Sequence, residues 1–190
     1  MRAFIAIELP LVIKDTLSKI QDRLKITLPK ISWVKPANLH LTLKFCGELS
    51  SKQLNDIKQL ITEIAKSTIN FKIKLETFGV FPNMHTARII WIGTNQLPLE
   101  LKKLVDQIET KIAELGKPKE ERPFSAHITI GRIKIHIDPS VLEKEINKIN
   151  NEISCENLGF NAKGITLFES TLSPQGPTYN VIEEANFKIT

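Results

Sequence analysis

The chain has 190 residues, 42% of them hydrophobic and 25% charged, with a formal net charge of +5. This balance indicates a folded protein with a real core, and without a run of about 20 apolar residues it predicts no transmembrane helix. The start of the chain lacks the pattern of a signal peptide, and Cys46 and Cys155 form neither a disulfide framework nor a paired metal spacing. We therefore expect a cytoplasmic protein, and the basic charge favours an anionic partner such as nucleic acid.

Hydrophobic periodicity predicts alternating strands and helices along the chain. In the first half the predicted elements are a strand at 2–8, a helix around 13–24, a strand from 39 to about 47, a helix at 51–66 and an extended segment at 71–81. Ser50 and Gln53 form a capping-box signature ahead of the second helix. In the second half they are a strand at 88–92, a helix at 101–115, a strand at 124–137, a helix at 138–153 and closing strands at 160–170 and 179–187.

The strand that begins near residue 39 carries the first chemically suggestive pattern. Leucines at 39, 41 and 43 alternate with polar residues, so His40 and Thr42 are predicted to point to one side, together with Lys44. Phe45 continues the leucine face in this interpretation. The same pattern recurs at His127 and Thr129, between two isoleucines.

The order of elements repeats with the histidines, which are 87 residues apart. The same offset carries Phe4 onto Trp91 and the helix at 51–66 onto 138–153. This predicts an α+β fold in which residues 1–190 form a single bilobal domain, an internal duplication. Its two pseudo-twofold-related lobes would be sheets of antiparallel type with helices outside, and each lobe would present one His-x-Thr strand to a central cleft. The alternative is one unsymmetric sheet with coincidental spacing.

Two histidines on opposite sides of a reacting atom can act as base and acid together. This suits an in-line displacement at phosphorus, in which threonine hydroxyls donate hydrogen bonds to phosphate oxygens. Arg132 is the best-placed cation, because it follows His127 by five residues on the same strand. We expect Gly131, just before it, to leave room for a ligand.

A metal site is the competing chemistry for two histidines. Zinc normally needs a third ligand from His, Asp, Glu or Cys, and neither motif contains a carboxylate. We therefore predict no metal and no cofactor. The sequence also lacks a Gly-x-Ser-x-Gly elbow and a phosphate-binding loop of the Gly-x-x-x-x-Gly-Lys type.

These motifs resemble those of the 2H phosphoesterases, and most closely the branch of RNA 2′,3′-cyclic phosphodiesterases, long called 2′-5′ RNA ligases. The matching segments are residues 1–7, 33–45, 122–132 and 170–179. Two positions, Cys46 and Ala126, carry residues that differ from those often found in this branch. The resemblance thus runs through both motifs and both ends of the chain.

The resemblance implies a bilobal fold and metal-independent hydrolysis of a 2′,3′-cyclic phosphate at an RNA end to a 2′-phosphate. It assigns His40 as the proton donor and His127 as the proton acceptor, with Thr42, Thr129 and Arg132 holding the phosphate. It also implies the reverse reaction, 2′-5′ ligation. We expect a monomer whose partner is RNA with 2′,3′-cyclic ends, tRNA fragments included, and not a membrane.

Other residues and functions stay open. Phe45 either packs in the core or stacks on a base, and Tyr179 either hydrogen-bonds substrate or only closes the sheet. Further expectations are lobe packing for Trp33, RNA contact or plain solvation for Lys35 and Lys44, and surface positions for His85 and His136. The alternatives in function are a 2H enzyme acting on another 2′-linked or cyclic nucleotide, and an RNA-binding module with a vestigial site.

Overall fold

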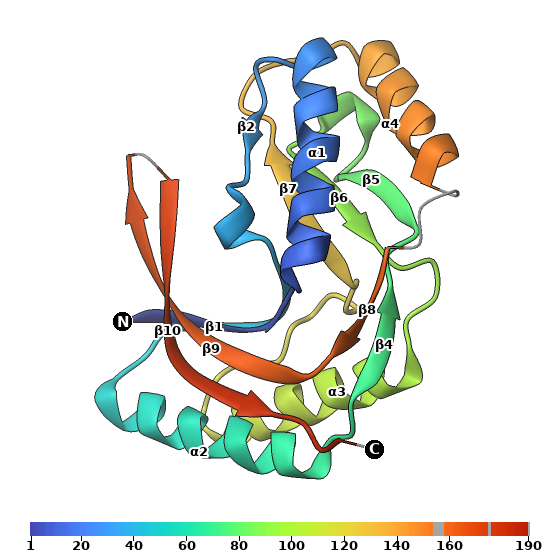
Figure 1. Cartoon of the computed structure of the whole chain (residues 1–190). Coiled ribbons are helices and arrows are strands. Elements are labelled where there is room, and N and C mark those ends of the chain that lie inside the picture. The colour runs from blue at the N-terminus through green and yellow to red at the C-terminus, as the bar shows by residue number, and fades with distance from the viewer. Residues whose placement is uncertain (154–157, 175, 190) are drawn as a thin grey trace.

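The computed structural model describes residues 1–153, 158–174 and 176–189 (Figure 1). The elements of the first half are β1 (Arg2–Glu8), α1 (Leu11–Thr27), β2 (Ser32–Trp33), β3 (His40–Glu48), α2 (Ser51–Ser67), β4 (Phe71–Lys74) and β5 (Thr77–Phe81). Those of the second half are β6 (Ile89–Gly93), α3 (Leu99–Glu114), β7 (His127–Arg132), α4 (Pro139–Ile153), β8 (Gly159–Ala162), β9 (Gly164–Ser173) and β10 (Gly176–Asn186). Short 3-10 helices occupy Pro36–Asn38 and Met84–Thr86.

The strands form two four-stranded antiparallel sheets. One has the order β10-β9-β1-β3 and the other β2-β7-β6-β5, while β4 pairs with β8 in a separate two-stranded ladder. Helices α2 and α3 cover the first sheet, and α1 and α4 cover the second (Figure 1). The apolar faces of sheets and helices together form one large buried cluster. The α+β class and the antiparallel sheets with outer helices are confirmed.

The two lobes repeat one another strand by strand. The order β3-β1-β9 in one sheet corresponds to β7-β6-β5 in the other, and an offset of 87 residues also carries α1 onto α3 and α2 onto α4. Strand β10, beside β9, and strand β2, beside β7, are additions to this shared plan. Two helices cross from one lobe to the other. Helix α1 follows β1 of the first sheet but packs on β7 of the second, and α3 follows β6 of the second sheet but packs on β3 of the first. The pseudo-symmetric lobes are therefore confirmed.

The capping box predicted ahead of α2 is confirmed, and two further helix ends have typical capping residues. Ser50 Oγ accepts a hydrogen bond from the Gln53 backbone, and the Gln53 side chain accepts one from the Ser50 backbone, which completes the capping box. Gly116 has a φ of +82° just after α3, a conformation that favours glycine. Asp138 caps α4 by accepting from the Ser140 backbone and hydroxyl, and these hydrogen bonds lower the pKa of its carboxyl. Cys46 is buried, which raises the pKa of its thiol to about 12, and Cys155 lies outside the described residues.

Three predicted strands have different bounds. The segment 71–81 is two strands, because its partner changes from Leu158 at Leu75 to Gly93 at Glu76. The first closing strand is likewise divided into β8 and β9. Strand β7 is much shorter than 124–137, because its pairing with β6 ends at Arg132. Periodicity does not reveal where a strand changes or loses its partner.

The prediction for Lys44 and Phe45 was wrong. The leucines at 39, 41 and 43 are buried as expected, but Lys44 is buried too, whereas Phe45 is 63% exposed. The cause is a β-bulge. Ile5 pairs with Lys44 and Ala6 with Thr42, so Leu43 has no partner on β1 and the alternation shifts by one residue. Phe45 consequently lies on the same face as His40.

Candidate active site

Each motif histidine is held by a backbone carbonyl two residues before it. His40 Nδ1 lies 2.7 Å from the Asn38 carbonyl, and His127 Nδ1 lies 2.8 Å from the Ser125 carbonyl. A carbonyl only accepts, so both rings carry their proton on Nδ1 when neutral. In both rings Nε2 is therefore the nitrogen that gains and loses a proton. Asn38 and Ser125 are themselves related by the 87-residue offset.

The threonine of the first motif contacts its histidine. Thr42 Oγ1 lies 3.0 Å from His40 Nε2, and in the neutral tautomer the hydroxyl donates to this nitrogen. Both side chains are half-buried. Thr129 holds the same position relative to His127 on β7, and it too is half-buried.

An aromatic cluster desolvates His40. The Phe4 ring centroid lies 4.8 Å from the His40 centroid, and Tyr179 presents its ring edge-on at 5.2 Å. Phe168 stacks on Phe4 behind them. This burial is the main reason that the pKa of His40 falls to about 4, and it outweighs the Asn38 hydrogen bond, which raises the pKa.

Charged groups from two other elements lie near enough to His40 to act on its charge, and β3, which carries His40, contacts β7. Lys14, Arg132 and His127 each lower the pKa of His40 further. Arg132 and His127 belong to β7 and Lys14 to α1, so groups from both halves of the chain converge on one imidazole. The structure therefore brings the two motifs together, as the duplication predicted.

A second aromatic cluster lies beside His127. Phe81 stacks on Trp91 at 5.0 Å and presents its ring edge-on to His127 at 5.1 Å. Trp91 and Phe81 are the counterparts of Phe4 and Phe168 at the 87-residue offset. The shared plan therefore includes an aromatic pair beside each histidine, whereas Tyr179 is added on β10 beside His40 alone.

The side chain of Arg132 is exposed, and a second bulge explains its orientation. Ile90 pairs with Gly131 and Trp91 with Thr129, so Ile130 has no partner on β6. The expectation that Gly131 leaves room for a ligand was wrong. A Cβ there would lie 2.8 Å from Ile31 and 3.2 Å from Trp33, so packing already fills this space. Trp33 has the packing role expected of it.

One of the two lysines, Lys44, has a different role from those expected. Lys44 is withdrawn from the site and pairs with Glu109, so both interpretations of it, RNA contact and solvation, were wrong. Lys35 is exposed. Sequence reasoning missed Lys14, since one lysine on an amphipathic helix carries no signal of what the helix packs against. It also missed Asn38, whose side chain donates to the Pro177 carbonyl and so ties β10 to the site.

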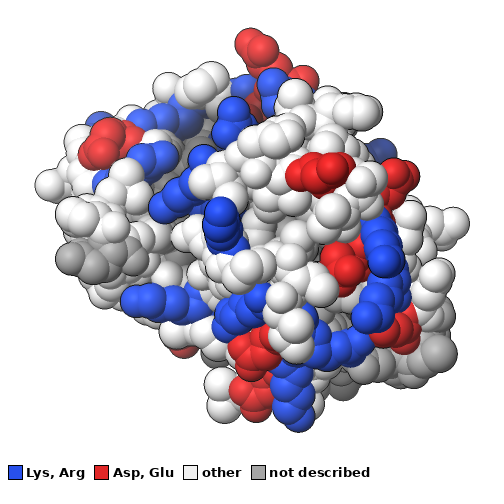
Figure 2. All heavy atoms as spheres, turned by 90° about the horizontal axis from the view of Figure 1, so that it is seen from above, with Lys and Arg blue, Asp and Glu red and all other residues white. Residues whose placement is uncertain are grey.

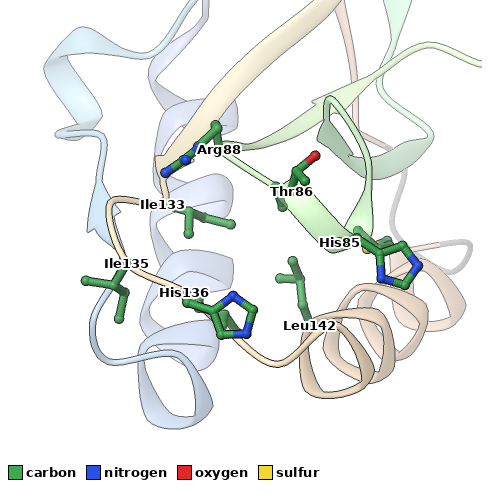
Figure 3. A pocket seen from close by; sticks show the side chains of 10 residues that line it. His85, Thr86, Arg88, Ile133, Ile135, His136 and Leu142 are labelled. Carbon is green, nitrogen blue, oxygen red and sulfur yellow. The ribbon is translucent and has the colours of Figure 1, made fainter.

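A pocket of about 250 Å³ lies apart from the two motifs, and none of its lining residues belongs to either. It lies between Met84–Thr86, the segment after β7 and the start of α4, and its wall includes the other two histidines, His85 and His136 (Figure 3). Both are exposed, as predicted. Leu142 and Ile133 supply apolar lining. Within the described residues, no group of three or more His, Cys, Asp or Glu side chains is arranged to hold a metal.

Figure 2 looks down on the molecule from the top of Figure 1 and shows Lys and Arg side chains bordering a recess in this face. Such a border favours an anionic ligand. None of the described helices is both long and apolar enough to cross a membrane.

Comparisons with known proteins agree with this geometry. The sequence profile of the family described as LigT like phosphoesterase matches twice, over residues 7–91 and 92–179, which follows the internal repeat. An RNA 2′,3′-cyclic phosphodiesterase of Methanocaldococcus jannaschii is 40% identical over 97% of this chain and 99% of its own. One from Methanothermobacter thermautotrophicus is 31% identical over 96% of this chain and 97% of its own.

Solved structures show the same fold. A Thermus thermophilus protein superposes with a TM-score of 0.82 at 26% identity, covering 98% of both chains. LigT of Escherichia coli, crystallised with 3′-AMP, superposes with a TM-score of 0.76 at 26% identity, covering 98% of this chain and 97% of its own. The duplicated profile match and the full-length relatives agree with the paired motifs, and the chain belongs to the LigT-like family of 2H phosphoesterases.

Proposed function

We propose that the protein hydrolyses the 2′,3′-cyclic phosphate at RNA ends to a 2′-phosphate without a metal. The observation that carries this proposal is the proximity of the two His-x-Thr strands, β3 and β7, in a chain 40% identical to a protein named RNA 2′,3′-cyclic phosphodiesterase. Two imidazoles, two hydroxyls and a guanidinium suit acid–base chemistry on an anionic phosphorus centre.

The two histidines divide the proton transfers. His127 Nε2 accepts a proton from water as the water oxygen forms its bond to phosphorus. The bond from phosphorus to the 3′-oxygen breaks, and His40 Nε2 donates a proton to that departing oxygen. The products are a 2′-phosphomonoester and a free 3′-hydroxyl. Each proton transfer of this kind contributes about 10²–10⁴ in rate.

The low pKa of His40 bears on its role as donor. In the free protein the ring is neutral at pH 7, because its pKa is about 4. A cyclic phosphate carries one negative charge, and an anion beside Nε2 raises the pKa of an imidazole. His40 therefore acquires its proton together with the substrate, and the free protein does not hold a charged imidazolium against its aromatic neighbours.

The remaining polar groups hold the phosphate. Thr42 and Thr129 donate from opposite strands to the non-bridging oxygens, and Thr42 turns its hydroxyl away from His40 once that nitrogen is protonated. Arg132 adds charge-assisted hydrogen bonds. Among the described residues, no carboxylate forms an ion pair with Arg132, so its guanidinium is available to substrate.

Two aromatic residues indicate on which side of the site the nucleotide base binds. Phe45 is 63% exposed beside Phe4, and we assign it as the platform on which a base stacks. Tyr179 is half-buried with its ring edge toward His40, a position from which its hydroxyl can bond to the ribose or phosphate. The 87-residue offset places Arg132, not an aromatic residue, at the position of Phe45 in the other lobe, and Tyr179 lies on β10, which the shared plan lacks, so the base is expected on the side of His40.

The same site carries 2′-5′ ligation, in which a 5′-hydroxyl takes the place of water: it loses its proton to His127 as its oxygen bonds to phosphorus, the bond from phosphorus to the 3′-oxygen breaks with a proton from His40, and a 2′-5′ linkage forms. Since both motifs are on one chain, residues 1–190 are expected to act as a single bilobal unit and as a monomer. The expected substrates are RNA fragments with 2′,3′-cyclic ends, including those of tRNA, in the cytoplasm.

The test is product analysis in EDTA with an RNA that ends in a 2′,3′-cyclic phosphate. The expected product is a 2′-phosphate end, with hydrolysis reduced by about 10²-fold or more in both His40→Ala and His127→Ala. His85→Ala, at an exposed histidine outside the site, is the matched control and should retain full activity. A 3′-phosphate product, or full activity in either motif variant, would refute the proposal.

A further inference from the structure

Three polar side chains are almost completely buried among the described residues, and two of them lie behind the motif strands. Gln21 is 2% exposed, Lys44 3% and Thr166 6%. A buried lysine or glutamine is costly unless its polar atoms are satisfied, so its contacts fix its place closely. Both Gln21 and Lys44 make contacts at the β-bulges of the motif strands.

The two motif strands share a bulge at one position, and β3 has a further register shift at Cys46, outside the motif. At the shared bulge the unpaired residue is Leu43 in β3 and Ile130 in β7, three residues after the histidine in both strands. The residue two further on, Phe45 or Arg132, is thereby turned onto the histidine face. Because side chains alternate along a strand, loss of a bulge would move these residues to the opposite face.

Lys44 follows the first bulge and extends away from the site. Its ammonium lies 2.9 Å from Glu109 of α3 and donates at 3.0 Å to the Pro118 carbonyl, and Glu120 lies 3.6 Å away. The backbone N–H of Glu120 also donates to Glu109. One buried ammonium therefore ties the bulge of β3 to the chain segment that leads to His127.

Gln21 makes the corresponding buried contact at the bulge of β7, in the other lobe. Its side-chain nitrogen donates at 2.8 Å to the carbonyl of Ile130, the unpaired residue of the second bulge, and at 2.8 Å to the Val34 carbonyl. Gln21 is on α1, the counterpart of the helix that supplies Glu109. In both lobes the crossed-over helix thus holds the bulge by a buried polar contact.

We propose that Lys44 and Gln21 are positioning residues, which hold the two bulges and thereby keep Phe45 and Arg132 facing the substrate. The proposal rests on the proposed function only for the part that Phe45 and Arg132 play there. Base stacking on Phe45 should then depend on Lys44, and phosphate binding by Arg132 should depend on Gln21. A residue that merely stabilises the fold would not show this division.

The experiment is a pair of double-mutant cycles on kcat/KM with cytidine 2′,3′-cyclic phosphate. Lys44→Met is combined with Glu109→Leu, because replacing both members of a buried ion pair by apolar residues leaves folding nearly unchanged. This variant should lose about tenfold in kcat/KM, as Phe45→Ala does, and adding Phe45→Ala should change little more. Gln21→Leu should behave in the same way with Arg132→Ala.

The two arms should differ in substrate dependence. The Lys44 variant should lose activity on the cytidine substrate but not on an abasic ribose 2′,3′-cyclic phosphate, whereas Gln21→Leu should raise KM for both. Lys58→Met, which removes a partly exposed ion pair with Glu183, is the control and should change neither. Additive losses in the cycles, or equal losses on both substrates in the Lys44 variant, would overturn the proposal.

A structural measurement separates this proposal from the proposed function. The Phe4 and Phe45 ring centroids lie 6.1 Å apart, close enough for nuclear Overhauser contacts. These contacts should disappear in Lys44→Met/Glu109→Leu and persist in Lys58→Met, whether or not the protein hydrolyses the substrate. If they persist in both variants, Lys44 does not position Phe45. If they disappear as expected but the wild type is inactive, only the proposed function fails.

Discussion

Acid should destabilise this protein through His40, because folding holds that ring in its neutral form. Burial lowers the pKa of His40 from 6.5 to about 4. Between these two values the unfolded chain binds a proton that the folded chain does not, so stability falls as the pH is lowered and is fully present above about pH 6.5. Integrated from pH 7.5 to pH 4, the linkage gives a loss on the order of 3 kcal/mol in the free energy of unfolding.

The assay is urea unfolding of the wild type and of His40→Gln at a series of pH values. All other titrating groups are common to both proteins, so the difference between the two curves isolates His40. It should be flat above pH 7 and steepest between pH 4 and 6.5, with a slope of about 1.4 kcal/mol per pH unit. His85→Gln, at an exposed histidine, should follow the wild type. Parallel curves for the wild type and His40→Gln would refute the argument from burial.

In a urea titration, Lys44→Met alone should lower the free energy of unfolding by about 3–5 kcal/mol, because it leaves the Glu109 carboxylate largely buried without its partner. In the same titration Lys58→Met, at a partly exposed ion pair, should lower it by about 1 kcal/mol or less. Gly131→Ala should cost about 1–3 kcal/mol in thermal unfolding, because the new Cβ would meet Ile31 at 2.8 Å; an unchanged Tm would mean that the packing adjusts freely. Arg132→Gln should raise KM for a cyclic phosphate by about 10- to 100-fold and weaken its dependence on salt, and a KM equal to that of the wild type would remove Arg132 from the site.

The catalytic strands could be predicted because their signals are local. Alternation around His40 and around His127 places His and Thr on one face whatever the rest of the fold does, and the constant offset between the motifs carries the duplication. The burial of the leucines in β3 and of the isoleucines in β7 follows from the same pattern. Capping residues likewise act within a few positions of one another.

The bulges could not be predicted, since contacts distant in the sequence hold them. Glu109 is 65 residues from Lys44, and Gln21 is 109 residues from Ile130. A lysine in an alternating strand looks like a solvated residue until its partner is known. For the same reason Phe45 was assigned to the wrong face.

The assignment of His40 as proton donor and His127 as proton acceptor is tested most directly with a substrate whose leaving group needs no proton. In a 2′,3′-cyclic substrate with sulfur in place of the 3′-oxygen, the departing thiolate is stable without an acid. His40→Ala should hydrolyse this substrate within about tenfold of the wild-type rate, although it loses about 10²–10⁴ on the oxygen substrate, while His127→Ala should be slow on both. Rescue of His127→Ala by sulfur, with His40→Ala still slow, would contradict the assignment of donor and acceptor.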